Sequence, residues 1–230
     1  MSHATWPTCA VAAAFRYADP VRGRFITFEG IEGVGKSTQL AHAALHLQSR
    51  GIDPVLTREP GGTPLAEQLR NLVLEPRDEP VTATAELLII FAARASHVAG
   101  KIRPALRRGR WVLCDRFTDA TEAYQGGGRD LSTAWIRQLA KIAHPRLTPD
   151  LTILLDAPPA LAIGRMEKRG LRLDRIETED VAFFERVRRG YLAIAEREPG
   201  RVRLIDATAD EQQVAAAVAR ELDTCLSGAK

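Results

Sequence analysis

The stretch FITFEGIEGVGKST, residues 25–38, decides the fold of this chain. A short apolar run, residues 25–28, leads directly into a glycine-rich loop of the pattern GxxxxGK[ST]. The fixed positions of that pattern are filled by Gly30, Gly35, Lys36 and Ser37. A strand, a loop of this spacing and a helix together surround the phosphates of a nucleotide with backbone N–H groups. The sequence therefore predicts a nucleotide phosphate site.

The whole loop is expected to contact the nucleotide. The residues assigned to nucleotide binding are Gly30, Ile31, Glu32, Gly33, Val34, Gly35, Lys36, Ser37 and Thr38. Lys36 is expected to neutralise charge on the β and γ phosphates, and the Ser37 hydroxyl to ligate Mg²⁺. Two carboxylates, Glu29 and Glu32, lie in a loop built for anions, which is unexpected. The loop alone leaves the acceptor open: water, a protein hydroxyl or a small metabolite.

Composition restricts the class of protein. The chain has 230 residues, a formal net charge of +3, 45% hydrophobic and 27% charged residues, as in an ordinary globular domain. The charge is too small to indicate nucleic-acid binding, and no apolar stretch approaches the roughly 18 residues of a membrane span. Three widely spaced cysteines without a CxxC pair indicate neither a disulfide framework nor a zinc site. We therefore expect a reducing compartment, the cytoplasm. Residues 1–23 are expected to be a poorly ordered extension without a signal peptide.

Short apolar runs alternate with helical stretches along the rest of the chain. The predicted strands are residues 25–28, 54–57, 111–114, 152–155 and 202–205, and the predicted helices are residues 36–49, 65–74, 83–98, 133–143, 159–168, 181–197 and 212–226. This alternation predicts an α/β fold with a doubly wound, parallel five-stranded sheet flanked by helices. We expect a single domain over residues 24–230 that includes a small lid at about 165–179. Ligands should bind beyond the carboxyl ends of the strands.

Two further motifs follow strands. TREPGGTPLAEQLR, residues 57–70, offers Arg58 and Arg70 to an anion, although a turn with two surface arginines is an equal alternative. LCDRF, residues 113–117, places Asp115 where the second half of a Mg²⁺ site belongs, beside Arg116, which could clamp a phosphate. The alternative there is a fortuitous salt bridge at a strand end.

Two motifs lie farther along the chain. TEAYQGGGR places Tyr124 and Gln125 before three glycines: a ring and an amide to frame a ligand, then a mobile turn. RMEKRGLRLDRIE, residues 165–177, is a basic run of the kind that usually forms a solvated face. In a P-loop protein it is also the expected source of a lid arginine, because phosphoryl transfer depends on positive charge placed on the moving group.

Taken together, these motifs resemble bacterial thymidylate kinase. The resemblance runs from about Arg24 to the C-terminal helix and rests on EGxEGxGKST, TREPGGT, FAAR, DRF, AYQGGGR, PDLTILLD and LDRIE, in that order. It implies a homodimer formed through helices near 65–100, a cis Glu59–Pro60 bond, and transfer from ATP to dTMP that gives ADP and dTDP for dTTP synthesis. The alternatives are another P-loop nucleotide or nucleoside kinase and, from a different class, a GTPase-like switch, for which no NKxD-type guanine reader is found.

The resemblance also implies roles for individual residues. Glu32 is expected to face the acceptor's sugar and phosphate, and Tyr124 to press on the sugar and disfavour a 2′-hydroxyl. Arg94 is expected at the thymine edge. The contacts to the acceptor phosphate are expected from Arg58, Arg70 and Arg116, and those near the base from Thr121 and Gln125. A phenylalanine that stacks on thymine in many relatives is replaced by Ile90 at its own position. Either the ring of neighbouring Phe91, the candidate, reaches over to the base, or an aliphatic surface replaces the ring.

Catalysis is assigned to placed charge. The loop has no basic residue among positions 31–34, so the resemblance implies a lid arginine, Arg169 first and Arg165 second. The catalytic set is Lys36, Arg169, Arg165, Arg116 and Glu32, with Ser37 and Asp115 for Mg²⁺. A phosphate monoester has a second pKa of about 6, so the acceptor is largely a dianion at neutral pH and no general base is needed.

Overall fold

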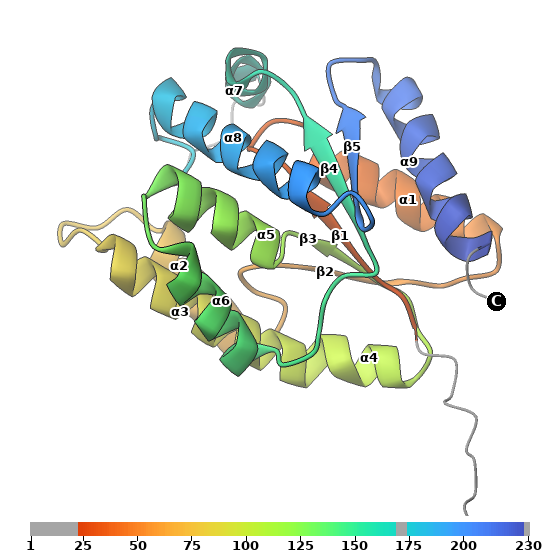
Figure 1. Ribbon diagram of the computed structural model, residues 1–230, viewed down its shortest axis with the longest axis horizontal. Coiled ribbons are helices and arrows are strands. Elements are labelled where there is room, and N and C mark those ends of the chain that lie inside the picture. Colours follow the sequence, from red (N-terminus) through yellow and green to blue (C-terminus); the bar gives the residue numbers. More distant parts are fainter. Residues whose placement is uncertain (1–22, 169–173, 228–230) are drawn as a thin grey trace, which may run out of the picture.

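Five parallel strands form the centre of the fold, as the sequence predicts (Figure 1). The computed structural model describes residues 23–168 and 174–227. The strands are β1 (Phe25–Glu29), β2 (Val55–Arg58), β3 (Val112–Asp115), β4 (Leu151–Asp156) and β5 (Val202–Asp206). Their order across the sheet is β2-β3-β1-β4-β5. The chain winds to one side of β1 first and to the other side later, so β1 marks the topological switch point where α/β sheets bind ligands.

The register brings three of the motifs to one edge of the sheet. Phe28 of β1 pairs with Asp115 of β3, which also pairs with Arg58 of β2. The phosphate loop, the DRF motif and the start of the REPGG motif therefore leave the sheet at the same level. The carboxyl ends of parallel strands lie at one edge of the sheet. Side chains that follow these ends are therefore close together without long connecting loops.

Helices cover both faces of the sheet. They are α1 (Lys36–Ser49), α2 (Pro64–Leu74), α3 (Ala83–His97), α4 (Arg103–Arg107), α5 (Thr118–Thr121), α6 (Thr133–Ala143), α7 (Pro159–Lys168), α8 (Val181–Arg197) and α9 (Glu211–Ser227). Figure 1 shows α1 and α9 together on one side, and α3, α4 and α6 along another. On α1, His42 and His46 face carboxylates of α9, Glu211 at 2.7 Å and Asp223 at 2.9 Å. These histidines therefore belong to a helix–helix contact.

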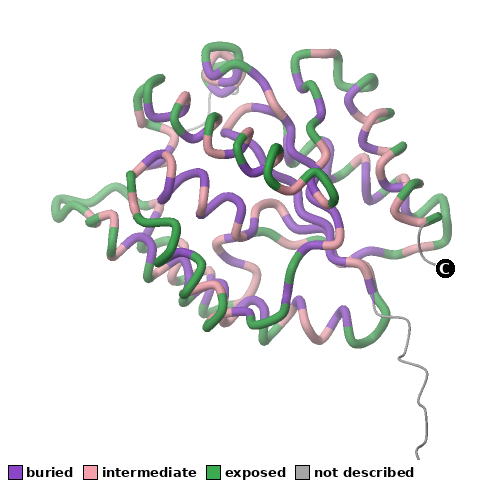
Figure 2. The backbone as a smooth tube through the Cα atoms, in the orientation of Figure 1, coloured by how far each residue is buried: buried purple, intermediate pink, exposed green. Residues whose placement is uncertain are grey.

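The central strands are buried and the edge strands are partly exposed (Figure 2). Every residue of β1 is buried, whereas β2 alternates between intermediate and exposed positions. A strand that helices cover on both faces is apolar along its whole length. Short continuous apolar runs in the sequence therefore predicted these strands. Among the described residues, no helix has both the length and the apolar character that a membrane crossing requires.

Two π-helical segments were not predicted. The segment η1 (Val98–Ile102) joins α3 to α4, and η2 (Glu122–Gly128) continues α5. The prediction of a mobile turn at the three glycines is wrong, because these glycines lie inside η2. A Cβ on Gly128 would lie 2.6 Å from the Phe183 ring of α8, and one on Gly127 would lie 3.1 Å from the Arg186 carbonyl oxygen. The glycines serve close packing of α8 on η2 rather than flexibility.

Gly23 is the first described residue. Residues 1–22 of the predicted extension lie outside the described residues. Gly23, its last residue, is buried, and its N–H donates to the Leu106 carbonyl oxygen at 3.1 Å. A Cβ at Gly23 would lie 1.9 Å from the Arg110 carbonyl oxygen, so only glycine fits at this close approach.

Candidate active site

The phosphate loop has the backbone that its glycines require. Gly30, Gly33 and Gly35 all have positive φ angles, of 132°, 76° and 93°. A Cβ on Gly30 would lie 2.3 Å from the Leu155 carbonyl oxygen, and one on Gly33 would lie 2.1 Å from the Ala162 carbonyl oxygen. The loop therefore lies tightly between β4 and α7. By contrast, a Cβ on Gly35 would meet no atom within 4 Å, so its need for glycine is conformational alone.

Lys36 is folded back onto its own loop. Its Nζ donates to the carbonyl oxygens of Gly30 at 3.1 Å and Ile31 at 2.7 Å. Burial, helped by the nearby positive charge of Arg116, lowers the pKa of Lys36 to about 8. The amine is thus bonded within its own loop, and it can exchange these carbonyl groups for anionic oxygens.

Ser37 and Asp115 lie together beside the loop. The Ser37 hydroxyl is 3.4 Å from one Asp115 carboxylate oxygen, and the other oxygen, Oδ1, is buried without a partner among the described residues. An unpartnered buried carboxylate oxygen next to a hydroxyl suits a hard cation. In the described part of the chain no cluster of three or more His, Cys, Asp or Glu side chains could hold a metal by itself. The pair therefore fits Mg²⁺ that keeps waters and phosphate oxygens as further ligands.

Both acidic residues, Glu29 and Glu32, have partners within the protein. Glu29 is fully buried and accepts hydrogen bonds from the Phe117 N–H at 2.7 Å and the Tyr191 hydroxyl at 2.8 Å. Burial, together with the negative charge of Asp119, raises the pKa of Glu29 to about 7. Glu32 is paired with the Arg116 guanidinium at 2.8 Å. The two carboxylates thus have separate structural partners, which resolves their unexpected presence in an anion-binding loop.

Arg116 is the central cation of the site. Its backbone has a φ of 70°, a left-handed conformation that costs energy for a residue with a side chain. Its guanidinium donates to the Gly30 carbonyl oxygen at 3.0 Å, Glu32 at 2.8 Å, and the hydroxyls of Tyr191 and Tyr124 at 3.1 Å each. The Tyr124 hydroxyl in turn donates to Glu32. Four contacts hold a strained residue in one place, as expected of a position under functional constraint.

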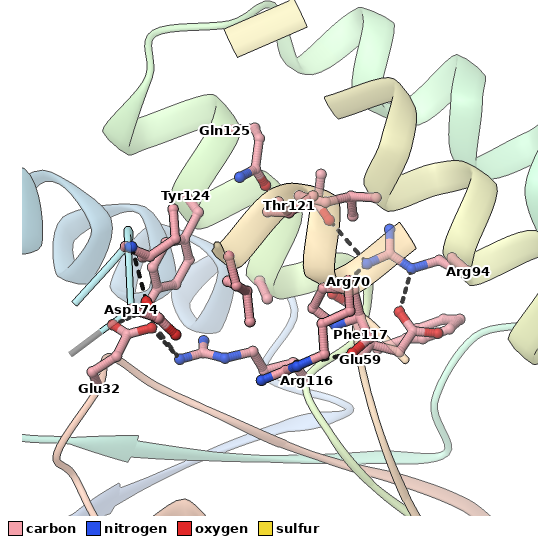
Figure 3. A pocket seen from close by; sticks show the side chains of 16 residues that line it. Glu32, Glu59, Arg70, Arg94, Arg116, Phe117, Thr121, Tyr124, Gln125 and Asp174 are labelled. Carbon is pink, nitrogen blue, oxygen red and sulfur yellow. Dashed lines mark hydrogen bonds and ion pairs between the residues drawn. The ribbon is translucent and has the colours of Figure 1, made fainter. Parts of the chain in front are cut away.

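Two cavities meet at this arginine. The first, here named the apolar pocket, is shown in Figure 3 and is lined by Glu32, Glu59, Pro60, Arg70, Val73, Leu74, Ile90, Arg94, Arg116, Phe117, Ala120, Thr121, Tyr124, Gln125, Asp174 and Ile176. The second, here named the phosphate-loop cleft, is lined by Glu32, Gly33, Gly35, Lys36, Ser37, Thr38, Arg58, Glu59, Arg70, Asp115, Arg116, Arg165, Asp174 and Glu177. The residues common to both are Glu32, Glu59, Arg70, Arg116 and Asp174. A ligand in each cavity would meet the other at a site with two arginines.

Arg94 presents a fixed charge at the far end of the apolar pocket. Its side chain is 2% exposed, and its Nε donates to Glu59 at 2.6 Å. Its Nη2 donates to the Phe117 carbonyl oxygen at 3.1 Å and to the Thr121 hydroxyl at 3.0 Å (Figure 3). Its Nη1 is buried and has no partner among the described residues. A buried guanidinium with one unused donor beside a pocket suits an acceptor atom on a ligand.

The carboxylate that holds Arg94 is itself held. Glu59 is buried, and its second oxygen is 2.9 Å from His97 Nδ1, while His97 Nε2 is 2.6 Å from the Thr57 hydroxyl. Burial alone would raise the pKa of Glu59, but Arg94 and His97 outweigh it and keep the pKa below its ordinary value. The Glu59–Pro60 bond is cis, so that prediction is confirmed. The REPGG motif therefore supplies the partner of the pocket arginine as well as a turn.

Phe91 does not line the apolar pocket, and the structure corrects that prediction. Ile90 lines the pocket, whereas Phe91 packs with Leu87 and Ile136, and its ring lies 4.8 Å from the Arg94 guanidinium carbon. Successive helical residues point about 100° apart, and Ile90 shares a face with Arg94 one turn later. A second ring, Phe117 of the DRF motif, lines the pocket and was missed. Its place directly after Arg116 was the available signal.

The other predicted phosphate contacts lie at the rim. Arg70 lines both cavities and donates to the Pro60 carbonyl oxygen at 2.8 Å. Arg58 lines the phosphate-loop cleft but not the apolar pocket, and it pairs with Glu67 at 2.8 Å with half of its side chain exposed. Arg58 therefore belongs to the donor side of the site in this structure and would have to leave Glu67 to reach an acceptor phosphate.

The basic run contributes unequally. Arg169, the first choice for the lid arginine, lies outside the described residues. Arg165 lines the phosphate-loop cleft, and its Nη1 donates to the Ala207 carbonyl oxygen at 2.8 Å. Arg175 instead donates to the Val73 carbonyl oxygen at 2.8 Å and pairs with Glu86. Arg175 is therefore paired within the protein, and the sequence analysis missed Asp174 and Ile176 as residues of the apolar pocket.

Comparison with known proteins places these features in a family. The family model described as "Thymidylate kinase" matches residues 28–218. A thymidylate kinase of Chromohalobacter salexigens is 55% identical over 206 residues, which cover 89% of this chain and 97% of the relative. One of Pseudomonas putida (strain GB-1) is 54% identical over 206 residues, covering 90% and 96%. The crystal structure of thymidylate kinase from Ehrlichia chaffeensis superposes with a TM-score of 0.69 at 34% identity and covers 88% of this chain and 99% of that one.

Proposed function

The chain belongs to the thymidylate kinase family and has the function of that family, and we propose which of its side chains bind each substrate. Thymidylate kinases transfer the γ-phosphoryl group of ATP to dTMP. We assign the apolar pocket to dTMP and the phosphate-loop cleft to the phosphates of ATP. The observation that carries the assignment is Arg94, whose unpartnered Nη1 beside the apolar pocket suits the O4 acceptor of thymine.

The acceptor nucleotide is oriented by three kinds of group. Ile90 and Phe117 offer apolar surface to the base, with Thr121 and Gln125 at its polar edge. We assign the Tyr124 ring, whose hydroxyl is bonded to Glu32 and Arg116, to the space beside the sugar. Arg116 and Arg70, which line both cavities, are assigned to the acceptor phosphate, and Glu32 to the sugar and phosphate surroundings. Alignment of the two nucleotides supplies much of the rate.

The donor phosphates are held by the loop. Backbone N–H groups of residues 30–38 surround them, and Lys36 exchanges its loop carbonyl partners for their oxygens. Ser37 and Asp115 would hold Mg²⁺, which supplies positive charge to the phosphates of the donor. Arg169, with Arg165 second, is assigned to the γ-phosphoryl group during transfer. The acceptor phosphate is largely a dianion at neutral pH, so no side chain has to remove a proton.

The proposed unit is one domain over residues 24–230, with a lid at about 165–179 and an extension over residues 1–23, in the cytoplasm. We further propose a homodimer through the face formed by α2, α3 and α6. Its exposed apolar side chains are Leu65, Leu72, Leu88, Trp135 and Ile142. Large apolar side chains that stay exposed are typical of interaction surfaces when they gather on one face. Light scattering should give the mass of a dimer, and Leu88→Lys should shift it toward the monomer.

A coupled assay for ADP release tests the substrate assignment. With ATP and Mg²⁺ present, dTMP should give the fastest turnover, dUMP should be slower, and dGMP and AMP should give almost none. Arg94→Met should lower kcat/KM for dTMP while the affinity for an ATP analogue stays the same. Equal turnover of dTMP and AMP would remove the apolar pocket from base recognition and favour another nucleotide kinase.

A further inference from the structure

Glu86 is a buried carboxylate for which the proposed function has no task. It lies in the first turn of α3, with none of its surface exposed. One oxygen, Oε1, accepts a hydrogen bond from Gln125 Nε2 at 2.7 Å, and Arg129 Nε is 3.5 Å from the same oxygen. The other oxygen, Oε2, pairs with the Arg175 guanidinium. Two arginines therefore compensate its charge, so that it can stay buried as a carboxylate.

A carboxylate at this place fixes which way the amide of Gln125 points. A carboxylate only accepts hydrogen bonds, so the NH₂ group of Gln125 must turn toward it. The carbonyl oxygen Oε1 is then at the other end of the amide. Gln125 is itself buried and lines the apolar pocket, which it enters from η2 above Tyr124 (Figure 3). The amide can therefore offer the pocket its carbonyl oxygen as an acceptor, because Glu86 holds the NH₂ end.

We propose that Glu86 is a specificity-determining residue: by holding the Gln125 amide in one orientation, it makes the pocket accept thymine and uracil and reject cytosine. The inference rests on the proposed assignment of this pocket to the acceptor base. Thymine and uracil have an N3–H donor next to the O4 acceptor. Cytosine has an N3 acceptor next to an N4–H₂ donor. The two patterns are opposite at both positions.

The pocket matches the first pattern at both positions. Arg94 offers donors only, and its orientation is fixed by Glu59 at 2.6 Å. Gln125 offers an acceptor, and its orientation is fixed by Glu86 at 2.7 Å. Each residue that reads the base is thus held by a buried carboxylate. Cytosine would bring an acceptor against Gln125 Oε1 and a donor against Arg94, which leaves buried polar groups unpaired.

The test is Glu86→Gln, measured as the ratio of kcat/KM for dUMP over dCMP, two acceptors that both lack the 5-methyl group. The new amide can donate to Gln125 Oε1, so the Gln125 amide can turn over and present its NH₂ group to the cytosine N3. We expect the ratio to fall at least about tenfold, with most of the change in KM for dCMP. Glu179→Gln is the matched control, because Glu179 also pairs with Arg129, at 2.6 Å, and it is not bonded to Gln125.

A double-mutant cycle separates orientation from general support of the fold. In a Gln125→Leu background, Glu86→Gln should have no further effect on the ratio, since no amide remains to be turned. An equal fall in both backgrounds would overturn the proposal, and so would an unchanged ratio in Glu86→Gln.

Gln125→Leu alone keeps the proposal testable if Glu86→Gln does not fold. It should lower the ratio at least about tenfold, because the acceptor opposite N3 is removed. An unchanged ratio there would remove Gln125 from base reading and overturn the proposal. Failure of the proposed function would show differently, as absence of dTMP turnover by the unchanged protein.

Discussion

The two halves of the site are organised in different ways. In the apolar pocket, the polar side chains are already held by protein partners: Arg94 by Glu59 and Arg116 by Glu32, at 2.6 and 2.8 Å. In the phosphate loop, Lys36 donates to two carbonyl oxygens of its own loop. The acceptor half is thus preorganised by buried carboxylates, whereas the donor half must exchange internal bonds for bonds to the ligand. Preorganisation reduces the ordering cost of binding, so we expect base selectivity from the first half and charge stabilisation from the second.

The largest expected effect is on the donor side, at the lid. Arg169→Ala should lower kcat by about 10³-fold or more, because an arginine on the transferred group contributes about 10³ to 10⁵ in rate. Its contact strengthens only as charge redistributes in the transition state, so dTMP affinity measured by calorimetry should stay the same. Arg165→Ala should lose less, since its Nη1 is already used by the Ala207 carbonyl oxygen. If Arg165→Ala collapses while Arg169→Ala retains a third of its kcat, the two roles are exchanged.

Lys36→Ala should have the next largest effect. Loss of one placed donor on developing charge costs about 10²- to 10³-fold in kcat. The affinity for dTMP should be unchanged, because the bonds of Lys36 run to the phosphate loop and none to a side chain of the base site. Lys141→Ala, an exposed lysine on α6, is the matched control. Near-normal turnover of Lys36→Ala would contradict the assignment of the loop.

Glu59→Gln tests the preorganised half. Removing the charge leaves Arg94 buried without its counterion, which costs about 3–5 kcal/mol in unfolding free energy. It should also lower kcat/KM for dTMP by about tenfold to a hundredfold while leaving the affinity for an ATP analogue intact. Urea unfolding and the coupled assay measure the two effects.

The ion pair of Glu59 and Arg94 also predicts how the stability of the protein changes at low pH. The pKa of Glu59 lies below its ordinary value of 4.5, with burial opposed and outweighed by Arg94 and His97. Its contribution to stability is therefore complete above pH 4.5 and is lost as the pH falls through the lowered value. In urea unfolding, the Glu59→Gln variant should not show this part of the decrease in unfolding free energy at low pH. A variant as acid-sensitive as the unchanged protein would assign the loss to other carboxylates.

The contrast between the halves also explains what could be predicted from sequence. The loop is a contiguous motif between a strand and a helix, so Gly30, Lys36 and Ser37 and all five strands were identified from local pattern. The pocket is assembled from α2, α3, η2 and residues 174–176, and its geometry depends on which helical face each residue occupies. The sequence could not decide between Phe91 and Ile90 for that reason, and Phe117 was overlooked.

The prediction of a mobile turn at residues 126–128 was wrong for a related reason. A run of three glycines indicates flexibility when read locally, but Gly127 and Gly128 permit the approach of α8 some sixty residues later in the chain. Likewise, Arg175 looks like a lid cation in the sequence and in the structure binds Glu86 on α3. Long-range packing and pairing decide both, and neither leaves a local signal.

The smallest expected effect is the pH dependence of donor binding. Burial, with Arg116 nearby, lowers the pKa of Lys36 to about 8 in the free protein. Only the charged amine attracts phosphate, so affinity for a non-hydrolysable ATP analogue should be about tenfold weaker at pH 9 than at pH 7. The affinity for dTMP should change less, because the guanidinium groups of the acceptor half stay charged over this range. Calorimetry at both pH values measures the two affinities.

The unfolding free energy of the protein should rise with pH, whereas the affinity for the donor falls. Because the pKa of Lys36 lies below its ordinary value of 10.5, the folded state releases this proton more readily than the unfolded state does. Its contribution therefore makes the unfolding free energy rise with pH between about 8 and 10.5, while donor affinity falls. Lys36→Met should abolish both slopes, and the comparison with dTMP binding shows whether the loop alone titrates. Donor affinity that stays level from pH 7 to pH 9 in the unchanged protein would mean that Lys36 keeps its proton despite burial, and the loop would then be as preorganised as the pocket.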